Sequence, residues 1–465
     1  MATLTFHGAA GGIVTGSCHR LDIKGSQYLV DCGLFQGGKR IEALNWQGFD
    51  FDPAQIKAIF LTHAHLDHVG RIPLLVRHGF RGKIISTDAT RDLAKVILYD
   101  AFKLYKEEVE RQKEKAKLSS MPELQYTEQD IEKALSLFEV VNYGQLQTLD
   151  NNIKFRLRDA GHILGSAIFE IWFPNEEGRE RKIVFSGDLG QPGQRIIKDP
   201  EYIREADYVV VESTYGGRVH PDKATTVLEF LQILKDIIKY KGVGLIPVFA
   251  VERAQEILYE LNLLVERGIL DEPISFYLDS PMAAEVTRIF ERYSKYYDED
   301  ALLLLEKGDQ PFRFKGLKIV TSVRQSKKLK NVRKAVIMAG SGMITGGRIG
   351  HHIINHASDP NTHIIFVGYQ VPGSIGRLIL DGRRKIKLYG KTVYINAKVH
   401  YLQGFSSHAD QLDLMYWLRN FGRGVREIYL VHGENSQREA LAQKIYLELQ
   451  RHPVLPLLGE TVYLK

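Results

Sequence analysis

The sequence predicts an α/β protein in which one domain is inserted into another. In the first ninety residues, short runs such as HRLDI, QYLVDCG and AIFLTHAH, rich in β-branched and aromatic residues, alternate with glycine-rich turns. From about Ser213 to Lys391, longer helical stretches alternate with buried strands, which is typical of an α/β unit with a largely parallel sheet. Strand character returns in KTVYINAKVHYLQGFSSHAD and EIYLVHGE. We therefore expect three segments, residues 1–212, 213–391 and 392–465, of which the first and last form one domain.

Between these regions the pattern changes twice. From about Arg91 to Leu137 the composition is helical and highly charged. Strands then resume in IKFRLRDAGH, AIFEIWF, KIVFSGD and YVVVEST, and each ends in a polar or glycine-containing turn. We expect the chemistry of the protein at these strand ends.

Composition limits the class of protein. With 465 residues, 44% of them hydrophobic, the chain can form two or three domains. No apolar run approaches the roughly 20 residues that cross a bilayer, and the opening MATLTFHGAAGG lacks the features of a secretory signal, so we expect a cytoplasmic protein without a membrane partner. Cys18 and Cys32 are too few for a disulfide framework and are predicted to be small core residues. The net charge of +6 permits binding to a polyanion without requiring it.

A dense group of metal-binding side chains follows the apolar strand Ala58–Leu61. The run Thr62-His63-Ala64-His65-Leu66-Asp67-His68 places three imidazoles and a carboxylate within six residues, and both groups suit zinc. One ion could not use all four comfortably. The spacing favours two adjacent ions, with His63 and His65 on the first and Asp67 and His68 on the second.

The segment HAHLDH resembles the signature of the metallo-β-lactamase superfamily, whose fold is a four-layer αββα sandwich. The resemblance implies that His162 in DAGH is the next ligand and that Asp188 in FSGD is a carboxylate shared by both ions. It also implies that Asp31 in LVDCG orients the ligands through hydrogen bonds without touching metal.

Three further segments resemble motifs A, B and C of the β-CASP nucleases: VESTYG at 211–216, SSHAD at 406–410 and VHGE at 431–434. This family includes ribonuclease J and the endonuclease subunit of the eukaryotic pre-mRNA 3′-end cleavage complex, and the resemblance covers nearly the whole chain. It implies a metallo-β-lactamase sandwich with an inserted α/β domain of largely parallel sheet.

The resemblance assigns roles to the motif residues. His432 would complete the second site, and Glu212 with His408 would form a hydrogen-bonded general acid. A histidine in motif C favours RNA over DNA, because the DNA-processing branch typically lacks it. The implied cofactor is two Zn²⁺ per chain, held by His63, His65, Asp67, His68, His162, Asp188 and His432; the implied catalytic residues are Asp67, Glu212 and His408.

Substrate contacts are implied for a smaller set of residues. The loop at 340–343 offers flexible backbone amides and a hydroxyl that could hold a phosphate. Glu252 stands where the family usually has glycine. Its carboxylate could repel phosphate or alter the path of the loop that carries Arg253. Two basic clusters, at 324–334 and 383–387, could contact RNA or simply face solvent. The implied substrate-binding residues are Arg253, Ser280, Ser341, Gly342, Met343 and Arg377.

These observations predict a zinc-dependent ribonuclease that hydrolyses single-stranded RNA and leaves a 5′-phosphate and a 3′-hydroxyl. Because no nucleic-acid-binding module follows motif C, we expect endonuclease activity, with exonuclease action left open. The rival hypotheses are an RNA-binding scaffold without activity and a metallo-hydrolase of a small molecule. Zinc against manganese, the physiological RNA and the formation of a homo-oligomer also stay open.

Overall fold

The computed structural model describes residues 2–116, 125–150, 153–270 and 272–465, which form two compact units. The sandwich unit comprises residues 1–192, 199–219 and 408–465, and the parallel-sheet unit comprises residues 193–198 and 220–407. One unit is therefore inserted into the other. The domain boundaries expected at 212/213 and 391/392 stay a prediction.

The sandwich unit contains two sheets. The first has seven strands in the order β21 (Thr461–Leu464), β1 (Ala2–Phe6), β2 (His19–Ile23), β3 (Ser26–Val30), β4 (Ile56–Phe60), β5 (Lys83–Ser86) and β6 (Phe138–Val140). The second has six strands in the order β20 (Glu427–Val431), β11 (Tyr208–Glu212), β10 (Glu180–Phe185), β9 (Ala167–Pro174), β8 (Ile153–Asp159) and β7 (Gln147–Asp150).

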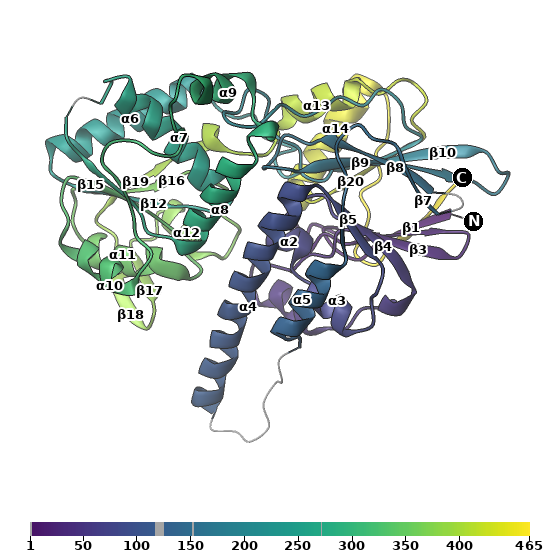
Figure 1. Ribbon diagram of the computed structural model, residues 1–465, viewed down its shortest axis with the longest axis horizontal. Helices are drawn as coiled ribbons and strands as arrows, with labels where there is room; N and C mark the ends of the chain where they lie inside the picture. The colour runs from purple at the N-terminus through teal and green to yellow at the C-terminus, as the bar shows by residue number, and fades with distance from the viewer. Residues whose placement is uncertain (1, 117–124, 151–152, 271) are drawn as a thin grey trace. The chain divides into compact units, whose positions relative to one another are not determined.

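Helices cover the outer faces of both sheets (Figure 1). The first sheet carries α2 (Leu66–Val69), α3 (Ile72–Arg77), α4 (Asp88–Ala116) and α5 (Glu128–Ser136). The second carries α13 (Gln411–Arg419) and α14 (Asn435–Leu449), whose apolar side chains join a buried cluster with Ile168, Val209 and Leu430. A further short helix, α1, spans Lys39–Glu42. This arrangement is the predicted four-layer αββα sandwich.

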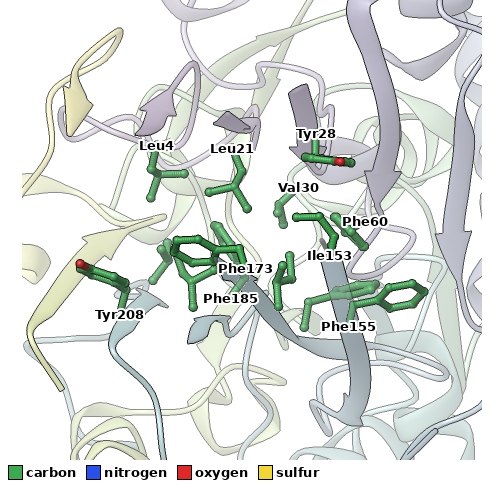
Figure 2. Packing of buried hydrophobic residues seen from close by; sticks show 14 of the residues in the cluster. Leu4, Leu21, Tyr28, Val30, Phe60, Ile153, Phe155, Phe173, Phe185 and Tyr208 are labelled. Carbon is green, nitrogen blue, oxygen red and sulfur yellow. The ribbon is translucent and has the colours of Figure 1, made fainter. Parts of the chain in front are cut away.

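The main core lies between the two sheets. Strand β8 shows the reason, because Ile153, Phe155 and Leu157 are buried whereas Lys154 and Arg156 between them are not. This alternation gives β8 one apolar face. Figure 2 shows the consequence, since side chains of the first sheet meet those of the second; among them are Leu4, Leu21, Val30, Phe155, Phe173 and Phe185.

The parallel-sheet unit is built around one six-stranded sheet in which every neighbouring pair is parallel. Its strands, in spatial order, are β14 (Leu317–Ile319), β13 (Ser275–Leu278), β15 (Ala335–Ala339), β12 (Val243–Pro247), β16 (Thr362–Phe366) and β19 (Lys398–Tyr401). A separate antiparallel hairpin pairs β17 (Lys385–Leu388) with β18 (Lys391–Tyr394). The predicted α/β character of this region is confirmed.

Seven helices accompany the described strands of this unit. They are α6 (Lys223–Lys239), α7 (Arg253–Glu266), α8 (Pro281–Arg292), α9 (Glu299–Glu306), α10 (Val323–Lys328), α11 (Gly347–His356) and α12 (Ile375–Leu380). A short 3₁₀ helix, η4 (Leu329–Asn331), follows α10.

Two predictions from composition can be compared with the structure. Cys18 and Cys32 are both buried with free thiols, as expected of small core residues. Among the described helices, none combines the length and the apolar character needed to span a bilayer.

The core of the sandwich should be sensitive at Phe60, the last residue of β4. Its ring is buried and packs on Phe155 and Phe169 from the opposite sheet, with centroids 5.3 and 5.4 Å away. We expect Phe60→Ala to lower the free energy of unfolding by about 3–5 kcal/mol, because it removes these contacts and leaves a cavity. Urea denaturation measures this change. The exposed residue Leu146 serves as the control, since Leu146→Ala should change stability by less than about 0.5 kcal/mol; equal effects of the two substitutions would contradict the packing described.

Candidate metal centre

Parallel strand pairing brings the sequence motifs to one edge of the sandwich unit. Strands β10, β11 and β20 run parallel and end next to Asp188, Glu212 and His432. Strands β3 and β4 are also parallel and end next to Asp31 and the run that begins at His63. Residues almost 370 positions apart in sequence are therefore neighbours in space.

The first cluster contains His63, His65, His162 and Asp188, whose donor atoms all lie within 4.8 Å of one another. The Nδ1 atom of His65 is 3.1 Å from Nε2 of His63 and 3.2 Å from Nε2 of His162. Oδ2 of Asp188 is 3.5 Å from Nε2 of His63 and 3.6 Å from Nε2 of His162. Three imidazoles and one carboxylate thus surround a common point.

The second cluster contains Asp67, His68 and His432, again with donor atoms within 4.8 Å. Nε2 of His432 is 3.1 Å from Nε2 of His68 and 3.4 Å from Oδ2 of Asp67. Oδ1 of Asp188 is 3.4 Å from His68 Nε2 and 3.6 Å from His432 Nε2. Asp188 therefore directs one oxygen towards each cluster, as the resemblance implies for a shared ligand.

The donor atoms fit divalent metal ions. Imidazole nitrogens face one another at hydrogen-bond distance, and Oδ1 of Asp188 is buried but accepts no hydrogen bond from the described residues. Converging lone pairs and an unsatisfied buried carboxylate are costly on their own, and a cation between them removes that cost. Imidazole with carboxylate is also a donor set that zinc prefers.

Asp31 forms a hydrogen bond with the second cluster without belonging to it, which is the role that the resemblance implies. Its carboxylate accepts hydrogen bonds from the backbone amide of Thr62 at 2.8 Å and from Nδ1 of His68 at 2.7 Å. The second contact requires a proton of His68 on Nδ1, which leaves Nε2 as the atom that faces the cluster.

Two threonines support the ligands, and the sequence interpretation passed over both. Thr62 Oγ1 contacts Asp31 at 3.0 Å and His63 Nδ1 at 3.1 Å. Thr214 Oγ1 donates to the carbonyl of His432 at 3.1 Å and lies 3.2 Å from Nδ1 of the same residue. Both lie inside the quoted motifs, at the start of THAHLDH and in VESTYG, but a hydroxyl is not a metal ligand in such sites and its position depends on the fold.

Glu212 and His408 form the predicted pair. The buried Glu212 carboxylate accepts from the backbone amide of Leu189 at 2.7 Å, and its Oε1 lies 3.2 Å from Nδ1 of His408. The His408 ring lies 4.5 Å from that of His162, and its side chain remains 17% exposed. His408 is thus held beside the first cluster but can still be reached by a substrate.

A close backbone approach makes this placement feasible. Gly190 pairs with His408 in an isolated β-bridge. A Cβ at Gly190 would lie 1.7 Å from the carbonyl oxygen of Gly161, so no other residue fits without moving the loop that carries His162.

The two clusters differ in the direction of their pKa shifts. Burial lowers the pKa of His65 to about 4 and that of His63 well below its usual range. Burial also disfavours protonated His432, but Asp188 and the hydrogen bond with Asp67 overcome this effect and raise the pKa of His432 to about 9. The carboxylates of Asp188 and Asp31 likewise outweigh burial and raise the pKa of His68. The metal-free second cluster therefore holds protons near neutral pH.

The residues implied in substrate binding lie in the parallel-sheet unit. Arg253 is buried, forms an ion pair with Glu256, and has an Nη2 atom without a hydrogen-bond partner among the described residues. Ser280 is the N-cap of α8, where its hydroxyl accepts from the amide of Ala283 at 3.2 Å. Both therefore have local structural contacts, and their roles towards substrate stay a prediction.

Glu252 occupies a backbone conformation that explains why the family prefers glycine there. Its φ is +66° and its ψ is −56°, and the amide of Arg253 donates to the carbonyl of Val251 at 2.9 Å. These values define a γ-turn with positive φ, which glycine adopts without a steric penalty and glutamate does not.

In the loop predicted to hold a phosphate, the side chain of Ser341 accepts hydrogen bonds from the loop's own backbone. Ser341 Oγ accepts hydrogen bonds from the amides of Thr345 at 3.0 Å and Gly346 at 3.2 Å. Among the described residues, the backbone amides of Gly342 and Met343 donate no hydrogen bond. Arg377 lies on α12, where it pairs with Asp381 at 2.9 Å.

Comparison with known proteins identifies the class. Residues 11–130 match the model of the metallo-beta-lactamase superfamily, residues 254–379 the Beta-Casp domain, and residues 392–456 a Zn-dependent metallo-hydrolase RNA specificity domain. The chain belongs to the β-CASP family of the metallo-β-lactamase superfamily, a family of metal-dependent hydrolases. The predicted family, fold class and type of enzyme are thereby confirmed.

Two relatives place the chain within this class, and one solved structure shares its fold. It is 40% identical over 438 residues to Ribonuclease TTHA0252 of Thermus thermophilus, covering 94% of both chains. It is 32% identical over 452 residues to Transcription termination factor FttA of Methanococcus maripaludis, covering 95% of this chain and 68% of the relative. A crystal structure of a protein of unknown function from Enterococcus faecalis V583 aligns over 100% of both chains with a TM-score of 0.54; at 14% identity it shows the shared fold alone.

The opposite pKa shifts predict different pH dependence for metal binding at the two clusters. An ion entering the second cluster must displace protons from His68 and His432, so its affinity should fall by up to about a hundredfold per unit as pH falls below about 9. The pKa values of His63 and His65 are lowered, so these two imidazoles hold no proton near neutral pH and add no such dependence to the first cluster.

Zinc titration by calorimetry, in buffers with different ionisation enthalpies, counts the protons released by each binding event. The raised pKa of His432 also implies that its protonation stabilises the metal-free fold below pH 6.5 and that this contribution is lost as pH rises through about 9. His432→Ala should abolish the proton-releasing event and leave the other. Equal proton release by both events would contradict the assignment.

Proposed function

We propose that this chain is a ribonuclease that uses two zinc ions to hydrolyse phosphodiester bonds in single-stranded RNA. The observation that carries the proposal is the position of Asp188, whose two carboxylate oxygens face different clusters of possible metal ligands. Oδ2 of Asp188 also lies 3.9 Å from Nδ1 of His408. Two relatives support it by name, one a ribonuclease and one a transcription termination factor. The match to an RNA specificity domain over residues 392–456 points to the same substrate.

The ligands would divide between two ions. His63, His65 and His162 would hold the first ion, Asp67, His68 and His432 the second, and Asp188 both. When bound, the two ions would lower the pKa of water and stabilise the negative charge on the phosphate oxygens. Asp31 and Thr62 would keep His63 and His68 in the orientation that binding requires.

His408 is placed to supply the proton for the leaving group. Glu212 accepts from Nδ1 of His408, so the transferable proton is carried on Nε2, on the other side of the ring. Because the ring is partly exposed, it can meet the 3′-oxygen of a bound strand. Protonation of that oxygen leaves a 3′-hydroxyl on the upstream fragment and a 5′-phosphate on the downstream one.

The nucleophile in this scheme is water, so the ribose 2′-hydroxyl is not required for the chemistry. Preference for RNA must come from binding, where backbone charge and base stacking accept any sequence. The amides of Gly342 and Met343 are candidates for a phosphate contact, with Arg253, Ser280, Ser341 and Arg377 as further candidates. Endonucleolytic cleavage and a cytoplasmic location belong to the same proposal.

The two rival functions are less well supported. A scaffold without activity would be expected to have lost ligands, but every ligand implied by the resemblance is present and converges. A hydrolase of small molecules does not need the inserted Beta-Casp domain or a Glu212–His408 pair.

The proposal predicts distinct defects when the metal ligands and the acid are removed. Wild type loaded with zinc should cut a labelled single-stranded RNA, and His65→Ala should lose activity together with zinc. His408→Ala should keep its zinc but cut about 10²–10⁴-fold more slowly, because it lacks only the proton donor. Gel-resolved cleavage and metal analysis of the same samples measure both properties.

A modified substrate separates acid catalysis from structural damage. A 3′-bridging sulfur leaves without protonation, so this substrate should restore cleavage by His408→Ala but not by His65→Ala. The exposed His452 provides the matched control, since His452→Ala should behave as wild type. Uncut RNA with folded, zinc-replete wild type would reject the proposed function, and equal cleavage by all variants would indicate a contaminating nuclease.

A further inference from the structure

Charge is segregated within the parallel-sheet unit. Residues 311–407 contain 17 lysines and arginines but only two acidic residues, Asp359 and Asp381. Residues 220–310 show the opposite balance, with 10 basic and 17 acidic residues. The net charge of the whole chain, +6, conceals this division. A strongly basic segment on one part of a unit is the electrostatic pattern of nucleic-acid binding.

Four exposed cations of this segment project from α10 and η4. They border an open depression of about 550 Å³ lined by Val323, Arg324, Lys327, Lys328, Lys330 and Asn331. The helix is held firmly, because Ser326 donates at 2.5 Å to Asp279, a fully buried carboxylate at the end of β13. A capping box between Ser322 and Gln325 fixes its first turn.

A second group of cations lies on the β17–β18 hairpin and the residues before it. Arg383, Lys385, Lys387 and Lys391 are all exposed, whereas Ile386, Leu388 and Val393 of the hairpin are buried. Tyr394 is 56% exposed, directly opposite Lys385, whose Nζ lies 5.7 Å from the tyrosine ring centroid. The hairpin therefore presents lysines and an aromatic ring together.

Helix α11 joins the two groups, although more than 50 residues separate them in sequence. On one side, Nε2 of His356 lies 3.1 Å from the carbonyl of Leu329 in η4. On the other side, the hydroxyl of Tyr389 in the hairpin turn donates to the carbonyl of Gly347 at 2.7 Å. A Cβ at Gly350 would lie 2.7 Å from the Tyr389 ring, so glycine permits this contact. Figure 1 shows α10, α11, β17 and β18 gathered at one end of the unit.

The electrostatic environment of His351 agrees with this geometry. His351 is an exposed residue of α11 whose ring lies 4.7 Å from that of Tyr389. Burial and the charges of His352, Lys391 and Lys327 lower its pKa. A lysine from each group is therefore close enough to this one imidazole to lower its pKa, in agreement with the contacts that α11 makes to both groups.

Within the part of the chain that the structure describes, the eight cations also lack carboxylate partners. No ion pair joins any of them to an acidic side chain in the described part of the chain. By contrast, Lys334, Arg348 and Arg377, which also belong to the basic segment, are paired with Glu272, Asp279 and Asp381. Charge left unpaired on a surface is available to an external anion.

We propose that Arg324, Lys327, Lys328, Lys330, Arg383, Lys385, Lys387 and Lys391 form a cationic face that binds the backbone of single-stranded RNA, with Tyr394 stacking on a base. The proposal extends the proposed function, because it names a part of the molecule, outside the unit that contains the metal centre, that retains a long substrate. Lysines that follow the backbone and an exposed ring that accepts any base together suit a single strand without sequence preference.

Binding measured in a variant that cannot cut tests the face directly. The probe is a fluorescent oligouridine of about 30 nucleotides, and every protein carries His65→Ala so that the RNA stays intact. Lys327→Gln with Lys387→Gln, one from each group, should weaken binding about 25-fold at about 0.1 M salt and reduce the slope of log K against log salt by about 1.4. Tyr394→Ala should weaken binding at least about 5-fold and leave the slope unchanged.

The matched control removes the same charge from the acidic half of the unit. Lys235 and Lys307 are exposed on or next to α6 and α9, at the opposite end of the unit in Figure 1. Lys235→Gln with Lys307→Gln should bind as the parent does. If the two double variants bind alike, or if the salt slope does not change, the face does not contact RNA and the inference is wrong.

The proposed function can be judged separately with the His65 side chain intact. Wild type should cut both a short oligonucleotide and the long RNA, whereas Lys327→Gln with Lys387→Gln should cut the long RNA with a raised KM. Failure of wild type to cut either RNA rejects the ribonuclease, whereas an unchanged KM for the long RNA rejects only the face. An anionic protein surface as the true partner would appear as unchanged RNA binding by the variants.

Discussion

The buried carboxylate of Asp188 is the constraint on which the rest of the site depends. It lies between two groups of imidazoles, with Oδ1 3.4 Å from His68 and Oδ2 3.5 Å from His63. A buried charge is stable only when it is compensated, and here protonated histidines or metal ions must provide the compensation. Strands β10, β11 and β20 are parallel and in register, which sets Asp188, Glu212 and His432 side by side. The apolar core between the two sheets supports that edge without contributing to its chemistry.

The imidazoles of the site are held by side chains that belong to neither cluster. Asp31 sets the tautomer of His68, and Thr214 contacts both the ring and the carbonyl of His432. Glu212, which is fully buried, contacts Nδ1 of His408. Each of these three imidazoles has its Nδ1 atom held by the protein, which restricts the orientation of the ring and its tautomer together.

The sequence was informative wherever chemistry is concentrated in a short segment. His63, His65, Asp67 and His68 could be predicted as ligands from their spacing alone, and His162, Asp188 and His432 from resemblance to the family. The supporting threonines, the capping role of Ser280 and the buried ion pair of Arg253 could not, because each depends on which backbone atoms the fold brings within 3 to 4 Å. Glu252 is a case between these extremes. Its departure from the family pattern is visible in the sequence, but the positive φ that explains the family's glycine is visible only in the structure.

The basic clusters illustrate the same limit on a larger scale. The sequence shows many cations at 324–334 and at 383–387, but neither run indicates which of them are neutralised. Folding pairs Lys334 with Glu272 and uses Arg384 to bind backbone carbonyls, while α11 brings the unpaired cations from both runs to one surface. The acidic and basic halves of this unit therefore present opposite charges to a partner, although the net charge of the whole chain is only +6.

The central claim is that the converging histidines and aspartates are a two-metal site. Anomalous diffraction from crystals of the protein, collected on both sides of the zinc and manganese absorption edges, tests it most directly. We expect two peaks, one among His63, His65 and His162 and one among Asp67, His68 and His432, with Asp188 next to both. The absence of anomalous signal at either position in active, metal-replete protein would contradict the account.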